Sequence, residues 1–245
     1  MRETILKAVR SVANKLGYTV IPSWRLDGLP LEQHLRRVFR RFSIDTVFDI
    51  GANAGQYHDF LRQRVQFDGV IHSFEPVATL ADKIAARAQS DMRWHLHRYA
   101  LGAEEATLEI NVTQRDTFSS FLEADVDESS SFASSMIVKQ REQVLVKRVD
   151  DIWRDLVSNP GKLYLKVDTQ GFDLEVLRGS IELLRAIKAL QFELSIQPIY
   201  KGTQNYLDIL RQLNEWGFVL SGLFPICSDD NLQIVEVDCV MVARL

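Results

Sequence analysis

From residue 43 to the C-terminus, short apolar runs alternate with longer amphipathic stretches. The apolar runs predict strands at 46–50, 70–74, 93–99, 163–168 and 190–195. The stretches between and after them predict helices at 55–64, 78–88, 172–187 and 206–216. This alternation is typical of a mostly parallel sheet with helices on both faces. Two further runs, 218–224 and 235–243, are close enough in sequence to form an antiparallel hairpin at the sheet edge. The pattern therefore predicts one α/β domain over residues 43–245.

Residues 1–42 differ from this rhythm and predict an N-terminal helical extension. Apolar residues recur there at helical spacing, with basic residues between them, and Gly17 is a natural end to the first helix. Residues 30–41 predict a second helix that leads into the domain. A basic amphipathic helix packs on its own domain, packs on a second subunit of a homodimer, or lies on a membrane surface. We favour packing.

Residues 103–150 interrupt the alternation and predict an insertion. The runs 106–112 and 144–149 alternate apolar and polar residues, as half-exposed antiparallel strands do. Between them lies a serine-rich, acidic span that carries Phe118, Phe121 and Phe132. A connection of this length is either disordered or a functional lid. The three aromatic residues favour a lid that closes over a ligand.

Composition narrows the class of protein without fixing its activity. The chain has 245 residues, 46% of them hydrophobic and 25% charged, as in ordinary globular proteins. Its net charge of −4 gives no electrostatic reason to expect nucleic acid as a partner. No apolar run reaches the roughly 20 residues that span a bilayer, and no signal peptide is evident, so we expect a cytoplasmic protein. The two cysteines, Cys227 and Cys239, have no CxxC or histidine-rich neighbour, so we expect no zinc site.

A glycine turn after the first predicted strand indicates a nucleoside cofactor. Asp49 lies near the end of the strand, and Gly51 and Gly55 flank the turn that leads into a helix. Such a turn lets backbone N–H groups approach a ligand. The pattern lacks the middle glycine that a pyrophosphate requires, because Asn53 stands there, and this favours S-adenosylmethionine. Glu75, at the end of the second strand, is placed to accept hydrogen bonds from ribose hydroxyls. The alternative is a purely structural strand–helix turn.

Charged residues occur where covered parallel strands should be apolar. Period-two alternation places Lys166 and Asp168 on one face of the fourth strand, and Glu193 on the fifth. A buried charge needs a partner, so these three side chains pair with each other or meet a ligand. One interpretation is an ion pair that only fixes the sheet. The other is catalysis, with Asp168 accepting the proton of an acceptor hydroxyl while Lys166 and Glu193 orient it.

Two further possibilities concern the same chemistry. A divalent cation such as Mg²⁺, held by Asp168 and Glu193, would acidify the hydroxyl instead; two carboxylates make a thin site, and we assign no metal ligand. His97, on the third strand, is a rival base that we rank below Asp168 because strand histidines are more often structural.

The motifs in order resemble those of FkbM-type methyltransferases. Five blocks carry the resemblance: Asp49-Ile50-Gly51-Ala52-Asn53-Ala54-Gly55-Gln56, Phe74-Glu75-Pro76, Ala100-Leu101-Gly102, Lys166-Val167-Asp168-Thr169-Gln170-Gly171-Phe172-Asp173, and Glu193 with Pro198, Tyr200 and Gly202. Asp173 stands where the family usually has Glu. The resemblance implies a seven-stranded class I methyltransferase (Rossmann-like) fold and O-methylation of a sugar, a glycoconjugate or a related natural product. By position, it implies cofactor contacts from Asp49, Gly51, Ala52, Asn53, Gly55, Glu75 and Pro76, with Ala100 and Leu101 near the adenine.

Two other functions remain as alternatives. An NAD-dependent sugar-modifying enzyme would need the absent glycine and a Tyr-x-x-x-Lys pair. A cofactor-binding assembly protein without catalysis would not need Lys166, Asp168 and Glu193. We therefore expect an S-adenosylmethionine-dependent O-methyltransferase whose acceptor is a small molecule or a glycan.

Overall fold

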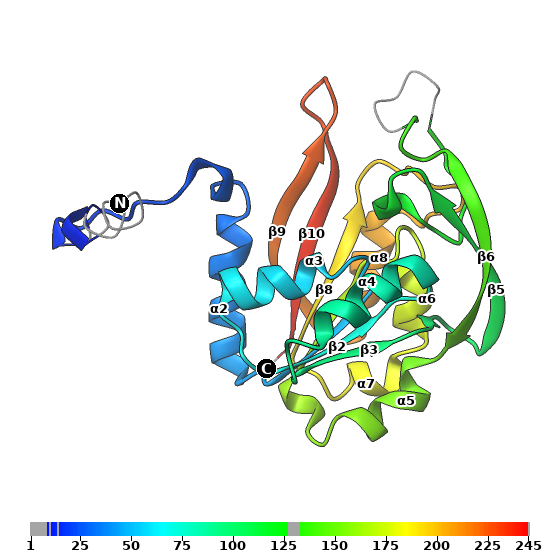
Figure 1. Cartoon of the computed structure of the whole chain (residues 1–245), viewed down its shortest axis with the longest axis horizontal. Coiled ribbons are helices and arrows are strands. Elements are labelled where there is room, and N and C mark those ends of the chain that lie inside the picture. The colour runs from blue at the N-terminus through cyan, green and yellow to red at the C-terminus, as the bar shows by residue number, and fades with distance from the viewer. Residues whose placement is uncertain (1–8, 10, 14, 127–132, 245) are drawn as a thin grey trace.

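The computed structural model describes residues 9, 11–13, 15–126 and 133–244. In this part of the chain a seven-stranded sheet has the order β3-β2-β1-β7-β8-β10-β9 (Figure 1). Its strands are β1 (Thr46–Ile50), β2 (Val70–Phe74), β3 (Trp94–His97), β7 (Leu163–Val167), β8 (Ala189–Ser195), β9 (Phe218–Ser228) and β10 (Ile234–Ala243). β3, β2, β1, β7 and β8 pair in parallel, and the β9–β10 hairpin adds antiparallel strands at the β8 edge. The predicted sheet and hairpin are confirmed.

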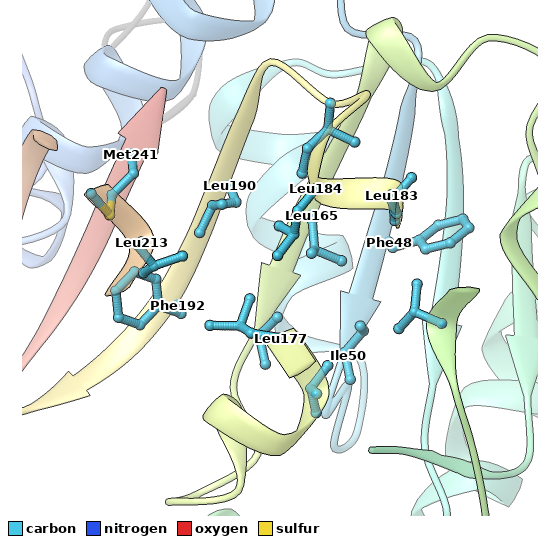
Figure 2. Packing of buried hydrophobic residues seen from close by; sticks show 14 of the residues in the cluster. Phe48, Ile50, Leu165, Leu177, Leu183, Leu184, Leu190, Phe192, Leu213 and Met241 are labelled. Carbon is cyan, nitrogen blue, oxygen red and sulfur yellow. The ribbon is translucent and has the colours of Figure 1, made fainter. Parts of the chain in front are cut away.

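One face of the sheet is covered by helices from the second half of the chain. They are α5 (Val149–Leu156), α6 (Asp173–Arg178), α7 (Ile181–Leu184) and α8 (Tyr206–Glu215). Figure 2 shows Leu177, Leu183 and Leu213 from these helices lying against Phe48, Leu165 and Phe192 of the sheet. All six side chains are buried, and burying each apolar side chain of this size stabilises the fold by about 1.5–3 kcal/mol.

The opposite face is covered by helices from the first half. They are α2 (Leu29–Phe42), α3 (Gln56–Asp59) with the π-helical turn η2 (Phe60–Val65), and α4 (Ala78–Ala88). Leu35 and Phe39 of α2 pack there with Tyr164 of β7. The odd and even residues of β7 thus enter different clusters, as the alternation predicts.

A smaller sheet lies beside the large one and contains the predicted insertion. It has the order β4-β6-β5, with β4 (Ala100–Leu101), β5 (Ala106–Thr113) and β6 (Val138–Lys147). The antiparallel pairing of β5 with β6 confirms the two predicted half-exposed strands. Ala100 and Leu101 follow β3 in the chain but do not continue the large sheet. They form β4, which pairs with β6.

The predicted helix over 172–187 is wrong as a single element, because it breaks between α6 and α7. At Gly179 an added Cβ would lie 1.9 Å from the carbonyl oxygen of Gly102, so the chain passes too close for a side chain. The carboxylate of Asp150 then accepts the backbone N–H groups of Glu182 and Leu183 and caps the new helix. Helix α5 was not predicted from the sequence, and the predicted helix over 55–64 is α3 continued by the π-helical turn η2.

The N-terminal extension leads away from the body of the molecule before α2 begins (Figure 1). Within its described part, Val9, Val12 and Leu16 are 48%, 58% and 69% exposed. These three side chains do not pack on the domain. The predicted packing of this helix on its own domain therefore does not hold for them. In the described ranges, no helix has the length and apolar character needed to cross a membrane.

Candidate active site

A cavity of about 470 Å³ opens at the carboxyl ends of β1, β2, β7 and β8. This volume is within the range of ligand pockets, and the position is where open α/β sheets bind their ligands. Residues from the glycine turn line it, together with α2, the η3 turn (Asp116–Phe118) and the C-terminal hairpin.

The glycine turn brings the backbone of β1 against that of β7. Gly51 has φ +77°, and a Cβ there would lie 1.8 Å from the carbonyl oxygen of Asp168. Only glycine fits both the conformation and the space. Asn53, with φ +50°, also adopts the left-handed conformation, which Asn tolerates better than most residues. Gly51, Ala52 and Asn53 therefore form one wall of the cavity.

Glu75 lies at the end of β2 and is only 4% exposed. Its Oε2 accepts the backbone N–H of Asn53 at 2.8 Å, and its Oε1 accepts that of Val77 at 2.9 Å. Burial raises the pKa of this carboxyl to about 8, although the two N–H groups pull the pKa down. Glu75 lines the cavity, so its remaining lone pairs can accept hydrogen bonds from a bound ligand.

An apolar region of the lining follows Glu75. Leu80 of α4, Ala100 and Leu101 of β4, Ile110 of β5 and Phe121 line it. Such a surface suits the flat face of an aromatic ring system.

Lys166 is the cation at the other end of the cavity. Its Nζ lies 3.1 Å from Oδ1 of Asp49 and 3.3 Å from Oδ2 of Asp168, and its side chain is only 7% exposed. Burial alone would lower the pKa of Lys166, but the charges of Asp168 and Asp49 raise it well above its usual value. Asp49 is buried behind it and accepts the Ser73 hydroxyl. The predicted pairing of Lys166 with Asp168 is confirmed, and Asp49 is its second partner.

Asp168 and Glu193 form a carboxyl pair that the Gln170 amide bridges. The Gln170 Nε2 donates to Asp168 Oδ1 at 3.1 Å and to Glu193 Oε2 at 2.6 Å. Burial, and then the Asp168 charge, raise the pKa of Glu193 well above its usual value. Burial would also raise the pKa of Asp168, but Lys166 and the hydrogen bond from Glu193 lower it overall. Of the two carboxyls, Glu193 therefore holds a proton more readily than Asp168, and both line the cavity.

The turn that carries Gln170 is held in place by Asp173. Its carboxylate accepts the backbone N–H groups of Thr169 and Gly171. Burial raises the pKa of Asp173 to about 6. The shorter carboxylate that departs from the usual motif therefore still makes contacts, and they fix the conformation of the Asp168–Gly171 turn.

Residues 116–122 cross the cavity between its two ends. The Asn53 side chain donates to the Asp116 carbonyl at 3.0 Å, and the Ser120 hydroxyl donates to the Gln170 carbonyl at 2.6 Å. Asp116, Thr117, Ser119 and Phe121 line the cavity. The segment therefore covers the site from the side of the insertion, whereas Phe132 of the predicted lid lies outside the described residues.

The sequence model of the methyltransferase FkbM domain matches residues 49–220. This range contains the glycine turn, Glu75, Lys166 and the Asp168–Glu193 pair. The chain belongs to the FkbM methyltransferase family. Its seven-stranded sheet with an antiparallel C-terminal hairpin is a class I methyltransferase fold, as the resemblance implies. S-adenosylmethionine is the cofactor of this FkbM methyltransferase.

Solved structures with a similar fold share little sequence with this FkbM methyltransferase. A rRNA methylase from Streptococcus thermophilus is 10% identical, with 87% of this chain and 94% of that chain covered and a TM-score of 0.45. Magnesium protoporphyrin IX methyltransferase from Synechocystis PCC 6803, with bound S-adenosylmethionine, is 10% identical over 97% and 96%, with a TM-score of 0.45. Fibrillarin from Aeropyrum pernix, with the same ligand, is 10% identical over 81% and 66%, with a TM-score of 0.47. A search of curated protein sequences found no match.

The cavity of the FkbM methyltransferase suits S-adenosylmethionine in its chemistry. Glu75 offers buried acceptor oxygens for two ribose hydroxyls, and the apolar region around Leu80 and Leu101 suits the adenine. Of the predicted cofactor residues, seven line the cavity: Gly51, Ala52, Asn53, Glu75, Pro76, Ala100 and Leu101.

Three predicted site residues lie elsewhere. Asp49 stands behind Lys166 instead of lining the cavity. Gly55 is packed against the Trp94 ring, which a Cβ there would meet at 2.7 Å. His97 is separated from the carboxyl pair: its Nε2 lies 3.0 Å from Nδ1 of His72, and its ring stacks on Phe74. Burial lowers the pKa of His97 to about 4. The structure therefore does not bring His97 to Asp168.

Three polar residues of the site, Gln170, Gln191 and Asp238, were not predicted to have a role there. Gln191 shares a face with Glu193, and Asp238 interrupts an apolar run of the hairpin, so both carried a signal in their pattern. Gln170 belongs to a motif block but gave no sign of its bridging amide. Among the described residues there is no cluster of three or more histidine, cysteine or acidic side chains suited to a metal ion.

Proposed function

We propose that this FkbM methyltransferase methylates a hydroxyl group of a sugar, a glycoconjugate or a related natural product. The observation that carries the proposal is the position of Asp168, which lines the cavity 3.3 Å from the Lys166 ammonium and shares the Gln170 amide with Glu193. S-adenosylmethionine supplies a methyl group on a positively charged sulfur, which passes to an oxygen nucleophile and leaves S-adenosylhomocysteine.

Asp168 accepts the hydrogen bond of the acceptor hydroxyl and then its proton. A hydroxyl oxygen becomes strongly acidic as it forms its bond to carbon, so a carboxylate with a low pKa is basic enough to take the proton. Lys166 keeps Asp168 ionised, and the Gln170 amide fixes the plane of the carboxylate. A general base of this kind contributes typically about 10²–10⁴-fold to the rate.

Glu193 and the segment 116–122 support this step by holding the site in place and shielding one side of it. Burial and the Asp168 charge raise the pKa of Glu193 well above its usual value, so Asp168 is the more ready acceptor of the substrate proton only while Glu193 holds its own. The covering segment shields only part of the cavity from bulk solvent, because the Asp168 side chain is still 36% exposed. The purely structural interpretation of the ion pair makes the opposite prediction, namely that loss of the Asp168 charge changes stability and leaves the rate alone.

The activity is tested with S-adenosylmethionine carrying a ¹³C-labelled methyl group. The purified protein is incubated with neutral glycan and small-molecule fractions from its native host, and the products are examined by NMR and mass spectrometry. We expect a labelled methyl ether, formed together with S-adenosylhomocysteine. Labelled methyl groups on nitrogen or carbon would refute O-methylation. The same reaction with EDTA distinguishes a carboxylate base, which is unaffected, from carboxylates that hold Mg²⁺, where added metal restores the rate.

A further inference from the structure

A second polar cluster lies in the cavity beside the carboxyl pair and takes no part in the proposed step. It consists of Tyr57 of α3, Gln191 of β8 and Asp238 of β10, all of which line the cavity. Asp238 is the cross-strand neighbour of Glu193. Side chains of such neighbours lie on the same face of the sheet about 5 Å apart. Asp238 therefore stands next to the Asp168–Glu193 pair, one strand further from the cofactor end. It also lies outside the residues that match the family model.

Two hydroxyl groups fix the orientation of the Gln191 amide. The hydroxyls of Tyr57 and Tyr164 both donate to its Oε1, at 2.8 Å and 3.2 Å. The amide nitrogen must therefore point the other way, and Nε2 donates to Asp238 Oδ1 at 2.7 Å. Gln191 is only 2% exposed, so water does not compete for these bonds. The carboxylate of Asp238 is consequently held in one position.

This arrangement uses one oxygen of Asp238 and leaves the other for a ligand. No described residue donates a hydrogen bond to Oδ2 of Asp238. Asp238 is half-buried and lines the cavity, so a bound molecule can reach this oxygen, and burial raises the pKa of Asp238 to about 6. A hydrogen-bond donor on the acceptor molecule would satisfy this oxygen.

The charges at this end of the cavity decide which donor fits. Among the described lining residues, Lys166 is the only cation, and Asp49 and Asp168 already engage it. Asp168 and Asp238 therefore present negative charge to an incoming group. A phosphate or carboxylate on the methylated unit would be repelled, whereas a neutral hydroxyl is attracted.

We infer that Asp238, held by Gln191, binds a second hydroxyl of the acceptor, adjacent to the one that is methylated. The inference rests on the proposed function, and it narrows the acceptor to a neutral unit with neighbouring hydroxyls. Asp238 acts here as a specificity-determining residue. Gln191 is the positioning residue that aims it.

The test measures binding of simple sugars to the protein saturated with S-adenosylhomocysteine. The probes are the methyl glycosides of glucose, mannose and rhamnose, with methyl glucuronoside as the acidic counterpart, detected by saturation-transfer NMR. We expect at least one neutral glycoside to bind and the glucuronoside not to bind. Asp238→Asn keeps the acceptor oxygen for Gln191 and removes the charge. This variant should weaken binding of the neutral glycoside about tenfold or more. It should also reduce the difference in affinity between the neutral glycoside and the glucuronoside.

Asp230→Asn is the matched control, because Asp230 is an exposed acid in the loop of the same hairpin. It should leave both probes unchanged, and neither variant should alter the affinity for S-adenosylhomocysteine. Binding of no neutral glycoside to the wild-type protein, or equal binding to wild type and Asp238→Asn, would overturn the inference. Because this assay needs no methyl transfer, a negative result here is distinct from failure of the methylation assay.

Discussion

The buried carboxyl of Glu75 predicts a pH dependence of cofactor binding that can be worked out from the structure. Its pKa in the folded protein is about 8, because burial outweighs the N–H groups of Asn53 and Val77. At pH 7 most molecules therefore carry a proton on Glu75. If two ribose hydroxyls donate to Glu75, the carboxylate is the form that binds, and binding expels the proton.

The expected magnitude follows from this pKa. Each pH unit below about 8 costs about 1.4 kcal/mol, which is tenfold in affinity. The Kd for S-adenosylhomocysteine should therefore fall about tenfold per pH unit from pH 6 to 7.5 and level off above pH 8.5. Titration calorimetry in buffers of different ionisation enthalpy would measure both the affinity and the proton released.

Glu75→Gln keeps the shape and removes the titration. At pH 8.5 it should weaken S-adenosylhomocysteine by about 1.5–3 kcal/mol, the range for hydrogen bonds to charged groups. Its Kd should lack the part of the pH dependence that Glu75 supplies. Glu215→Gln, at an exposed position on α8, is the control and should behave as wild type. Equal pH dependence in wild type and Glu75→Gln would refute this role for Glu75.

The raised pKa of Glu75 also determines how the free energy of unfolding changes with pH. In the unfolded chain Glu75 titrates near 4.5, and in the folded protein near 8. The folded state therefore binds the proton more tightly, so Glu75 makes the protein less stable as pH rises from 4.5 to 8. In Glu75→Gln, the single amide oxygen cannot accept hydrogen bonds from both backbone N–H groups. This loss lowers the free energy of unfolding by the same amount at every pH. The stability deficit of Glu75→Gln relative to wild type should accordingly shrink as pH rises through this window.

Three further predictions follow from the same structure. Lys166→Met should destabilise the protein by about 3–5 kcal/mol in denaturant unfolding, because it leaves buried Asp49 without a counter-charge. Adding Asp49→Asn should recover part of that loss; unfolding at the wild-type midpoint would show that the pair is not stabilising. S-adenosylhomocysteine should slow hydrogen exchange in residues 116–122 but not in α8, and equal strong protection with and without ligand would refute a moving lid. If the N-terminal extension packs on a second subunit, Leu16→Asp should convert a dimer into a monomer, as measured by light scattering. A wild-type protein that is monomeric at tens of micromolar would exclude that packing.

Most of the large sheet was predictable from sequence because period and composition report burial. The run 46–50 is covered on both faces and is apolar except for Thr46 and Asp49. The pairing of Lys166 was also predictable, since a charge within such a strand needs a partner. The break between α6 and α7 was not, because it depends on Gly102 and Asp150, which are distant in sequence.

The role of individual site residues depends on the same long-range contacts. Nothing local indicates that Asp49 lies behind Lys166 or that His97 pairs with His72. Period-two alternation puts Gln191 beside Glu193, but only the packing of Tyr57 and Tyr164 fixes which way its amide points. Sequence thus located the strand ends that form the site, and the orientation of each side chain came from tertiary structure.

The central claim is that Asp168 removes the proton of an acceptor hydroxyl, and the most direct measurement is kcat for Asp168→Asn beside the Kd for S-adenosylhomocysteine. Asparagine keeps the shape and removes the charge, and Asp155→Asn on the exposed side of α5 is the matched control. The structure predicts that kcat falls by about 10²–10⁴-fold in Asp168→Asn only, while the Kd changes by no more than a few fold. An Asp168→Asn enzyme that turns over at the wild-type rate would contradict the claim.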